Sequence, residues 1–323
     1  MMRERRIHST RLALCVVAAV FAACGVAASP ALATRAEREQ AEFLAFANCP
    51  FGASPELDCS WASSTYKEMW PSKKRKEEWE TQRERKAEEL PSQFTAGNVT
   101  VPLRSTITLR GGIGLTEEEG TTKETWFGAE GAATIEPVPQ AARPLTKDVN
   151  TALLSPTELN RYNYYTKVSK ETKVTATVEL AGPASAIQVS VINLLEETGT
   201  AFAFPVKLKL SNPFFGSSCY VGSNSSPIVV EFTTGTSGSL RGKNGSALEG
   251  APNGIITVYT DTLVNATFAS PGVEGCGVGG GADAAINAAL GLPSPSGDNA
   301  SVLNGTLKLA SAEDAKEGLE GKI

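Results

Sequence analysis

The chain has 323 residues, 41% of them hydrophobic, and carries a formal net charge of −5 at pH 7. An acidic chain of this composition lacks the basic stripe that nucleic acids and anionic membrane surfaces require, so we predict no nucleic-acid partner. The only histidine is His8, which excludes histidine triads, histidine general bases and histidine-ligated zinc or copper from the segments that follow. The sequence predicts no cofactor and no metal site, and it favours a protein that is not an enzyme.

Residues 1–33 have the pattern of a signal peptide for the Sec pathway. Four arginines precede an uncharged apolar run over residues 12–28, and Ala31 and Ala33 supply the small residues that a signal peptidase reads. The run is about 17 residues long, at the lower limit for a spanning helix, so we predict cleavage between Ala33 and Thr34. Cleavage removes four basic residues and one acidic residue, which moves the net charge from −5 to −8. No transmembrane segment is predicted after the signal is removed, because every later apolar run is short or interrupted.

A second interpretation of the same segment is lipidation. Phe21-Ala22-Ala23-Cys24 resembles a bacterial lipobox, although Phe21 fits the usual leucine position poorly, and the thiol of Cys24 would then carry a diacylglycerol. Cleavage at Ala33 predicts a secreted protein, whereas lipidation of Cys24 predicts a protein anchored in the cell envelope.

Four cysteines follow the signal peptide: Cys49, Cys59, Cys219 and Cys276. An even number in an exported protein indicates two disulfides, for which three pairings exist. We favour Cys49 with Cys59 and Cys219 with Cys276, because residues 50–55 between the first two are rich in turn-forming residues. A metal or redox site is disfavoured, since the chain has no CxxC spacing and no histidine near these cysteines.

The first segments of the mature chain predict helical structure. Residues 34–48 indicate a short helix or an ordered lead-in to Cys49. Residues 71–90 predict a charged helix, which Pro71 begins and Pro91 ends. Because a helix that is polar on all sides cannot be buried, we predict a solvated arm. Its surface carries i,i+4 ion pairs between Lys73 and Glu77, Lys74 and Glu78, Lys76 and Glu80, and Arg85 and Glu89.

From residue 93 onward the hydrophobic period changes to two, which is typical of β-strands. Residues 201–210 show the alternation best, since the apolar residues from Phe202 to Leu210 share one face and Lys207 and Lys209 point to water. The first predicted strand stops at Gly111-Gly112. The predicted strands are 98–109, 173–180, 187–192, 201–210, 227–232, 255–268 and 302–309.

Only residues 282–290 interrupt these strands with a short helix, and residues 311–323 form a polar tail that is helical or frayed. Many short alternating strands with turns between them predict a mainly β protein. The expected architecture is an antiparallel β-sandwich or partly closed barrel with a charged helical insertion and one short helix near the C-terminus.

Several blocks of sequence stand out as a set: Cys49-Pro50 with Cys59, Val99–Leu103 followed by Ile107–Gly112, Leu210–Ser223, and Gly275–Gly277 leading to Ala285–Asn287 and Gly291–Ser294. As a set they resemble a family of uncharacterised secreted proteins of actinobacteria. The resemblance covers most of residues 45–310 and implies export, disulfides and a β fold, with no assigned activity. In that family the second cysteine is followed by only a short link to the Val-Pro-Leu strand. Residues 66–91 are therefore expected to be an insertion into a single β domain spanning 34–310.

Two groups of acidic residues are candidates for chemistry. Glu117–Glu119 would offer oxygens to Ca²⁺, but the segment lacks the alternating ligands of a calcium loop, so a solvated loop is favoured. Glu196, Glu197 and Glu231 are candidates for a glycosidase-like pair, which requires two carboxyl groups about 5 to 10 Å apart.

Three other motifs have simpler interpretations. The cluster of Tyr162, Tyr164 and Tyr165 would stack on sugars or pack against the core in a strand or turn. Residues 277–281 are rich in glycine but lack the spacing of a phosphate-binding motif, so we expect a flexible loop. The asparagines of six Asn-X-Ser/Thr sequons are interpreted as turn residues; they are Asn98, Asn224, Asn244, Asn265, Asn299 and Asn304.

The leading hypothesis is a secreted or cell-envelope β-rich protein that binds an unknown cell-surface or extracellular partner or serves as a structural component. One alternative is a carboxylate-based hydrolase of wall polysaccharide. The other is a lipid-binding or pore-forming β-barrel, suggested by the alternation from Phe202 to Leu210, although the strands lack clear aromatic girdles.

Overall fold

The computed structural model describes residues 40–64, 91–118, 121–145, 149–244, 246–248 and 254–322, all within one compact unit that begins at Glu39. The signal peptide with its cleavage site, Cys24 and the charged helix predicted over 71–90 lie outside the described residues.

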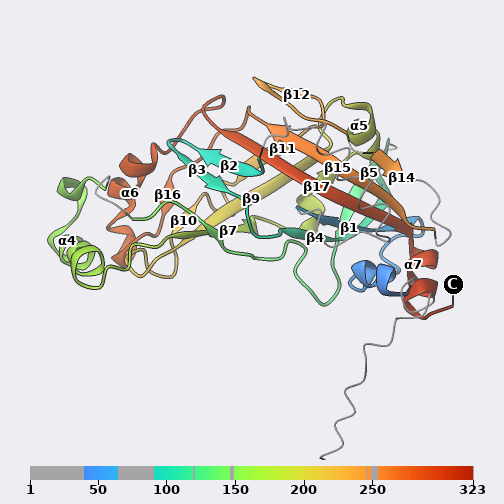
Figure 1. Ribbon diagram of the computed structural model, residues 1–323, viewed down its shortest axis with the longest axis horizontal. Helices are drawn as coiled ribbons and strands as arrows, with labels where there is room; N and C mark the ends of the chain where they lie inside the picture. The colour runs from blue at the N-terminus through green and yellow to red at the C-terminus, as the bar shows by residue number, and fades with distance from the viewer. Residues whose placement is uncertain are drawn as a thin grey trace, which may run out of the picture. The chain divides into compact units, whose positions relative to one another are not determined.

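The protein is mainly β, as predicted, and its main sheet is an antiparallel half-barrel (Figure 1). Its strands are β1 (Leu57–Ser63), β2 (Gln93–Ala96), β3 (Val99–Pro102), β4 (Thr108–Glu118), β5 (Thr121–Gly128), β6 (Gln140–Ala141), β7 (Thr175–Leu180), β8 (Gln188–Val189), β9 (Phe202–Ser211), β10 (Tyr220–Val221), β11 (Ile228–Phe232), β14 (Ser246–Leu248), β15 (Ile256–Asn265), β16 (Val273–Glu274) and β17 (Ala300–Ser311). A separate hairpin joins β12 (Thr236–Ser237) and β13 (Leu240–Arg241).

Short helices connect these strands. The α-helices are α4 (Pro156–Asn163), α5 (Val191–Glu196), α6 (Asp283–Leu290) and α7 (Ala312–Leu319). The remaining turns are η1 (Leu44–Phe46), η2 (Thr151–Leu153), η3 (Tyr164–Val168), η4 (Ala184–Ala186) and η5 (Val278–Gly280). None of the described helices has the length and apolar character needed to cross a bilayer.

Two long strands, β9 and β17, organise the sheet; Figure 1 shows them in yellow and red. β17 pairs with β15 along one edge and with β1 and β2 along the other. β9 pairs with β7 and β8 along one edge and with β10 and β11 along the other. The path β17-β1-β4-β5-β8-β9 joins them, and a bridge between Thr233 and Val264 brings the end of β11 to β15. The sheet therefore wraps around an interior that both long strands face.

The predicted alternation on residues 201–210 is confirmed by β9. Phe202, Val206 and Leu208 are buried and face the interior. Lys207 and Lys209 lie on the opposite face, where their ammonium groups stand 5.1 and 5.9 Å from the centre of the Tyr220 ring. The strands predicted over 173–180, 227–232, 255–268 and 302–309 are likewise present as β7, β11, β15 and β17.

The predicted strand 98–109 is two strands, because residues 103–107 do not join the ladder. The buried side-chain oxygen of Gln140 instead accepts hydrogen bonds from the amides of Arg104 and Ser105, at 3.0 and 2.9 Å. These amides are thus satisfied by a side chain rather than by a neighbouring strand.

The predicted stop at Gly111-Gly112 is wrong, since β4 continues through both glycines to Glu118. On the inner face, a Cβ at Gly111 would stand 2.5 Å from Nε1 of Trp126; on the outer face, a Cβ at Gly112 would stand 2.8 Å from Cδ1 of Leu57. At each glycine a large side chain from a neighbouring strand lies where a Cβ would be. The two glycines therefore allow close packing on both faces of the sheet, and they do not form a turn.

Two helices replace structure that the sequence pattern assigned to strands or turns. The run 187–192 forms only the short β8 before α5, whose N-cap Ser190 accepts a hydrogen bond from the amide of Asn193. The tyrosine cluster lies on α4 and η3, and α4 begins with Ser155 accepting from the amide of Glu158. Both helix starts carry a serine cap that competes with the strand pattern. The helix predicted over 282–290 is confirmed as α6.

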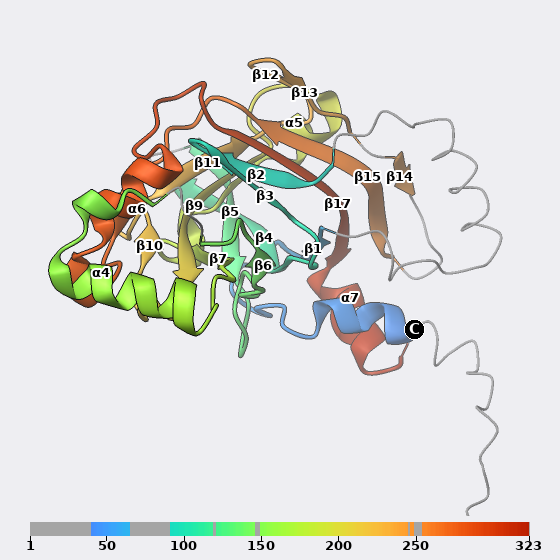
Figure 2. The same cartoon turned by 60° about the vertical axis from the view of Figure 1, so that its left-hand side comes forward.

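Both favoured disulfides are present, between Cys49 and Cys59 and between Cys219 and Cys276. The first belongs to a group of buried side chains on the outer face of β1 and β17, which we call the packed cluster: Phe43, Phe46, Cys49, Leu57, Cys59, Ile255, Ala310 and Ala315. The polar tail over 311–323 contributes α7, which lies beside η1 (Figure 2). The Phe43 ring packs directly on Gly318 of that helix, at a distance that leaves no room for a Cβ.

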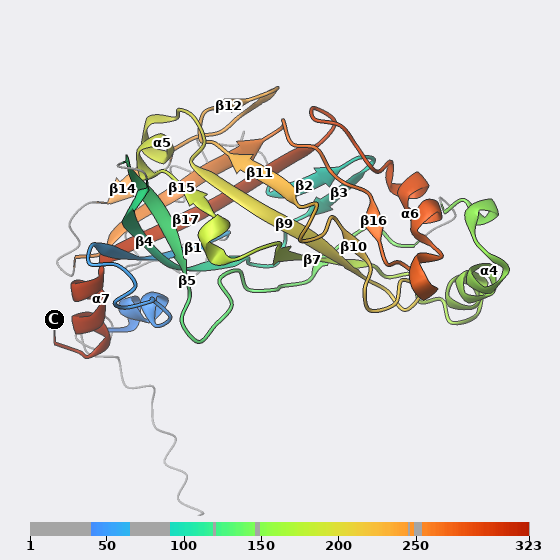
Figure 3. The same ribbon diagram turned by 180° about the vertical axis from the view of Figure 1, so that it is seen from behind.

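The second disulfide joins the start of β10 to the loop after β16. These two strands lie at the opposite end of the half-barrel from α7, near α4 and α6 (Figures 1 and 3). There the buried Glu158 pairs with Arg161 at 2.8 Å and accepts a hydrogen bond from the amide of Val278 at 2.8 Å. Arg161 also donates to the carbonyl oxygen of Phe214 at 3.0 Å. These contacts join α4 to the β9–β10 turn and to the loop after Cys276.

Candidate functional site

The interior of the half-barrel contains a cavity of about 130 Å³, which we call the inner cavity. Phe202, Phe204 and Val206 of β9 form one wall, and Leu303 and Leu307 of β17 form the facing wall. β1, β4, β7, β11 and β15 complete it. Native interiors leave few voids larger than a water molecule, so a space of this size inside the core is a candidate binding site.

The inner cavity exists because its two walls carry side chains of different size. The wall formed by β1 and β17 includes Ala62, Ser301 and Gly305, whereas β9 and β11 contribute phenylalanines. The rings of Phe202 and Phe204 stack on each other at 5.6 Å, and Phe204 meets Phe232 edge-on at 6.1 Å. Aromatic side chains held by one another in this way do not extend into the space that the small residues leave.

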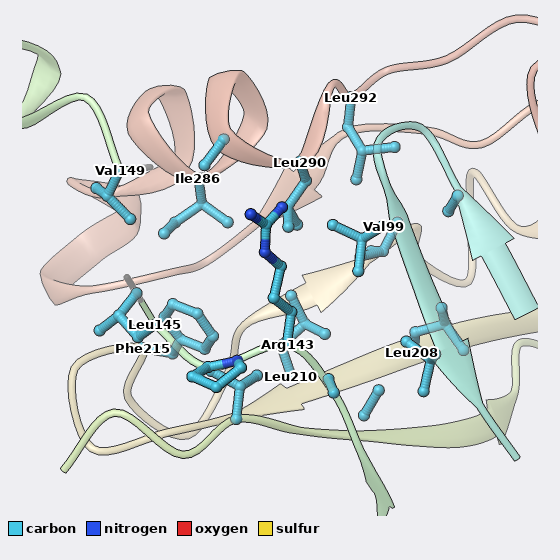
Figure 4. Close-up of a pocket in the computed structure, with 18 of the residues that line it drawn as sticks. Val99, Arg143, Leu145, Val149, Leu208, Leu210, Phe215, Ile286, Leu290 and Leu292 are labelled. Atoms are coloured by element: carbon cyan, nitrogen blue, oxygen red, sulfur yellow. The ribbon is translucent and has the colours of Figure 1, made fainter. Parts of the chain in front are cut away.

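A second cavity of about 80 Å³, the outer cavity, lies next along β9 and is shown in Figure 4. Its lining comes from β2, β3, β7, β9, β10, α6, residues 142–145 and Val149. Phe94 and Leu208 line both cavities. Val206 lies on the inner side of Leu208 and Leu210 on the outer side, so the two cavities follow one another along a single strand.

Arg143 alone carries a charge among the described residues that line the two cavities. Its aliphatic stem runs along the apolar wall of the outer cavity, and its guanidinium group is directed toward Leu290 of α6 (Figure 4). Arg143 is exposed, so the charged end of the side chain lies where the outer cavity meets solvent.

Two unpaired polar groups lie beyond the end of the inner cavity. The layer formed by Ala62 and Leu109 lines the cavity, and the next pair along the same strands is Ser60 and Gly111. The indole ring of Trp126 covers Gly111. In the part of the chain that the structure describes, no hydrogen-bond partner is present for two buried atoms, Ser60 Oγ and Trp126 Nε1. Buried polar groups of this kind favour a polar atom or a water molecule beside them.

A third cavity, of about 260 Å³, lies on the outer surface and is polar. Its lining includes Lys207, Tyr220, Asn224 and Glu274. Lys207 Nζ donates to the side-chain oxygen of Asn224 at 2.9 Å and lies over the Tyr220 ring. Lys207 and Asn224 thus satisfy each other, and they are not free to bind a ligand without breaking this contact.

The acidic candidates are not brought together in the interior. Glu196, Glu197 and Glu231 line neither the inner nor the outer cavity. The carboxylate oxygen Oε2 of Glu197 lies 3.7 Å from Nη2 of Arg241, and Oε1 accepts a hydrogen bond from the backbone amide of Asn244. None of the three carboxylates therefore belongs to the apolar interior, and the hydrolase hypothesis stays a prediction.

The calcium candidate is placed only in part. Glu117 is exposed near the end of β4, and Glu119 lies outside the described residues. In the ranges that the structure covers, no group of three or more His, Cys, Asp or Glu residues is placed to hold a metal ion.

The tyrosine and asparagine motifs have structural roles. Tyr162 is buried and meets Phe214 edge-on at 5.5 Å, whereas Tyr164 is exposed and contacts Tyr165. Asn299 is buried, accepts from the amide of Gly97 at 2.9 Å and donates to the carbonyl of Phe268 at 2.8 Å. It connects the β2–β3 turn to the loops near α6, so a glycan could not be attached there without unfolding the site.

The cavities were not predicted from the sequence. A usable signal was present in the small interior positions of two strands, Ala62 in β1 and Gly305 in β17, opposite the phenylalanines of β9. Arg143 gave no signal, because it stands in an irregular segment whose position depends on the fold.

No family model, curated protein or solved structure matches this chain. Its function is accordingly inferred from the geometry of the interior.

Proposed function

We propose that this protein is an exported binding protein that holds an apolar molecule inside its half-barrel. The observation that carries the proposal is the inner cavity, a space of about 130 Å³ lined mainly by apolar side chains of the sheet. For comparison, an engineered cavity of about 150 Å³ in another protein stays dry and binds benzene. The inner cavity is therefore large enough for a ring or a short run of methylene groups.

The energetics indicate what kind of apolar molecule would bind well. Each buried methylene contributes about 0.8 kcal/mol, and association costs at least about 4 kcal/mol. About ten buried methylenes would then give a Kd near 1 mM, and about fifteen would give a Kd near 1 μM. A ligand confined to one cavity is too small for micromolar affinity, so the occupant we propose is a chain that extends into both.

Export is part of the proposal. The predicted signal peptide over residues 1–33 supports it, and so do the two disulfides, which are typical of oxidising compartments. Membership of the family of actinobacterial secreted proteins, suggested by the sequence blocks, is consistent with this role. An exported protein with an apolar interior would carry or retain a molecule that is poorly soluble in the extracellular medium.

The test uses a neutral fluorescent probe, N-phenyl-1-naphthylamine, whose emission rises in apolar surroundings. Val230 of β11 is buried and lines the inner cavity, whereas its neighbour Val229 is 45% exposed on the opposite face. Val230→Phe fills the cavity, and Val229→Phe is the matched control with the same change in side chain.

We expect the wild-type protein and Val229→Phe to enhance the probe's emission to the same saturation, and Val230→Phe to lose most of the enhancement. Thermal unfolding of all three proteins checks that each is folded. Equal binding by the two variants, or no enhancement with the wild-type protein, would overturn the proposal.

A further inference from the structure

We propose that the occupant is a long-chain carboxylate, with its charged group held by Arg143 at the mouth of the outer cavity and its chain reaching the inner cavity. This inference rests on the proposed function and specifies the ligand class. Three observations lead to it: the charge at the mouth, the path between the cavities and the width of that path.

The charge at the mouth selects an anionic head group. Arg143 alone is charged among the described lining residues, and the wall behind it is formed by residues such as Leu145, Leu210 and Leu290. An arginine guanidinium offers five donors in a planar fork that matches a carboxylate in a bidentate way. It can therefore hold a ligand carboxylate while keeping contacts with the protein.

The path between the cavities selects a long ligand. The lining follows β9 from Leu210 through Leu208 and Val206 to Phe202. Eight strand steps of about 3.3 Å give a length of about 26 Å. A molecule whose head lies at Arg143 must be extended to reach the inner cavity.

The width of the path selects a single chain. Phe94 and Leu208 stand at the boundary of the two cavities, and the Phe94 ring is held against Phe268 at 5.3 Å between ring centres. Because both side chains belong to both linings, a chain that runs from one cavity to the other has to pass between them. A single methylene chain requires the least displacement there, whereas a fused ring system or a pair of chains would force the strands apart.

The unpaired groups beyond the inner cavity define the competing orientation. Ser60 Oγ and Trp126 Nε1 would attract a polar head that entered first, with the chain trailing toward Arg143. In that orientation affinity would depend on Ser60 and not on Arg143.

The experiment measures binding of hexadecanoate, hexadecanol and octanoate to the exported, disulfide-bonded protein by isothermal titration calorimetry. The variants are Arg143→Gln, Ser60→Ala and the control Arg241→Gln, whose side chain is 78% exposed and lines neither interior cavity. We expect Arg143→Gln to weaken hexadecanoate binding about tenfold, the lower end for a hydrogen bond to a charged group. The same variant should leave hexadecanol binding unchanged, and Arg241→Gln should change neither.

Chain length tests the path. Affinity should rise about fourfold for each methylene added between octanoate and hexadecanoate, as long as each new methylene enters the protein. Affinity that stops rising within this series would confine the ligand to the outer cavity and overturn the two-cavity path.

Equal losses for hexadecanoate and hexadecanol in Arg143→Gln, or a loss with Ser60→Ala alone, would overturn the assignment of the head group. In either case probe binding that depends on Val230 would leave the proposed function standing. Failure of all three ligands and of the probe would overturn both.

Discussion

The half-barrel interior and the packed cluster are built from the same kinds of side chain but are filled to different degrees. In the packed cluster Phe43 and Phe46 are each 1% exposed, and α7 places a glycine where a side chain would collide with the Phe43 ring. In the interior, phenylalanines of β9 face Ala62 and Gly305 across a cavity of about 130 Å³. Apolar composition is therefore compatible both with a packed core and with a binding site, and the difference lies in the pairing of large with small residues.

The largest expected effect comes from reduction of the two disulfides, one in the packed cluster and one at the end of the half-barrel near α4 and α6. In the loop-entropy account, the 10-residue separation of Cys49 and Cys59 is worth about 2.7 kcal/mol and the 57-residue separation of Cys219 and Cys276 about 4.2 kcal/mol. Their sum approaches the whole stability of a typical domain. We expect the protein to lose its cooperative thermal transition in reductant.

Double alanine variants separate the two regions. Removal of Cys219 and Cys276 should lower the free energy of unfolding, measured in urea, more than removal of Cys49 and Cys59. An unchanged melting temperature in reductant would contradict the structural role of both bonds.

A matched pair of phenylalanines compares the two regions directly. Phe46→Ala in the packed cluster should cost about 3 to 5 kcal/mol, the usual range for a fully packed phenylalanine. Phe202→Ala in the wall of the inner cavity, where the residue is 4% exposed, should cost clearly less, because part of that ring faces space and has no partner atoms to lose. Urea unfolding of both variants measures the difference, and equal costs would show that the interior is as tightly packed as the cluster.

The smallest effect concerns pH. Asp58 is an exposed residue of β1 on the face opposite Leu57 and Cys59, and partial burial of its carboxyl group raises its pKa above the ordinary value of 3.8. A raised pKa in the folded state means that folding favours the protonated form. This contribution is fully present below pH 3.8 and is lost as the pH rises through the folded-state pKa.

Asp58→Asn should therefore gain melting temperature relative to the wild-type protein as the pH is raised from 3.5 to 6. The gain is small because Asp58 is exposed to solvent. A constant difference across this pH range would show that Asp58 titrates alike in the folded and unfolded chains.

Much of the fold could be read from local patterns. The alternation in β9 predicted the interior face of Phe202 to Leu210 and the outward direction of Lys207 and Lys209 correctly. The predicted strand end at Gly111-Gly112 was wrong. These glycines lie inside β4, where the absence of a side chain leaves room for Leu57 of β1 and Trp126 of β5. The strand assignment also failed at α5, where the serine cap at Ser190 outweighed a β-branched run.

Local patterns in the chain predicted the mainly β class, the faces of the longest strands and the favoured disulfide pairs, because periodicity, turn residues and cysteine spacing are local properties of the chain. The cavities and the place of Arg143 follow instead from how distant segments pack together. The volume of a cavity depends on which residues face each other, and here Ala62, Val206 and Leu303 come from three separate strands. Their pairing follows from the order and curvature of the sheet, which no single segment encodes.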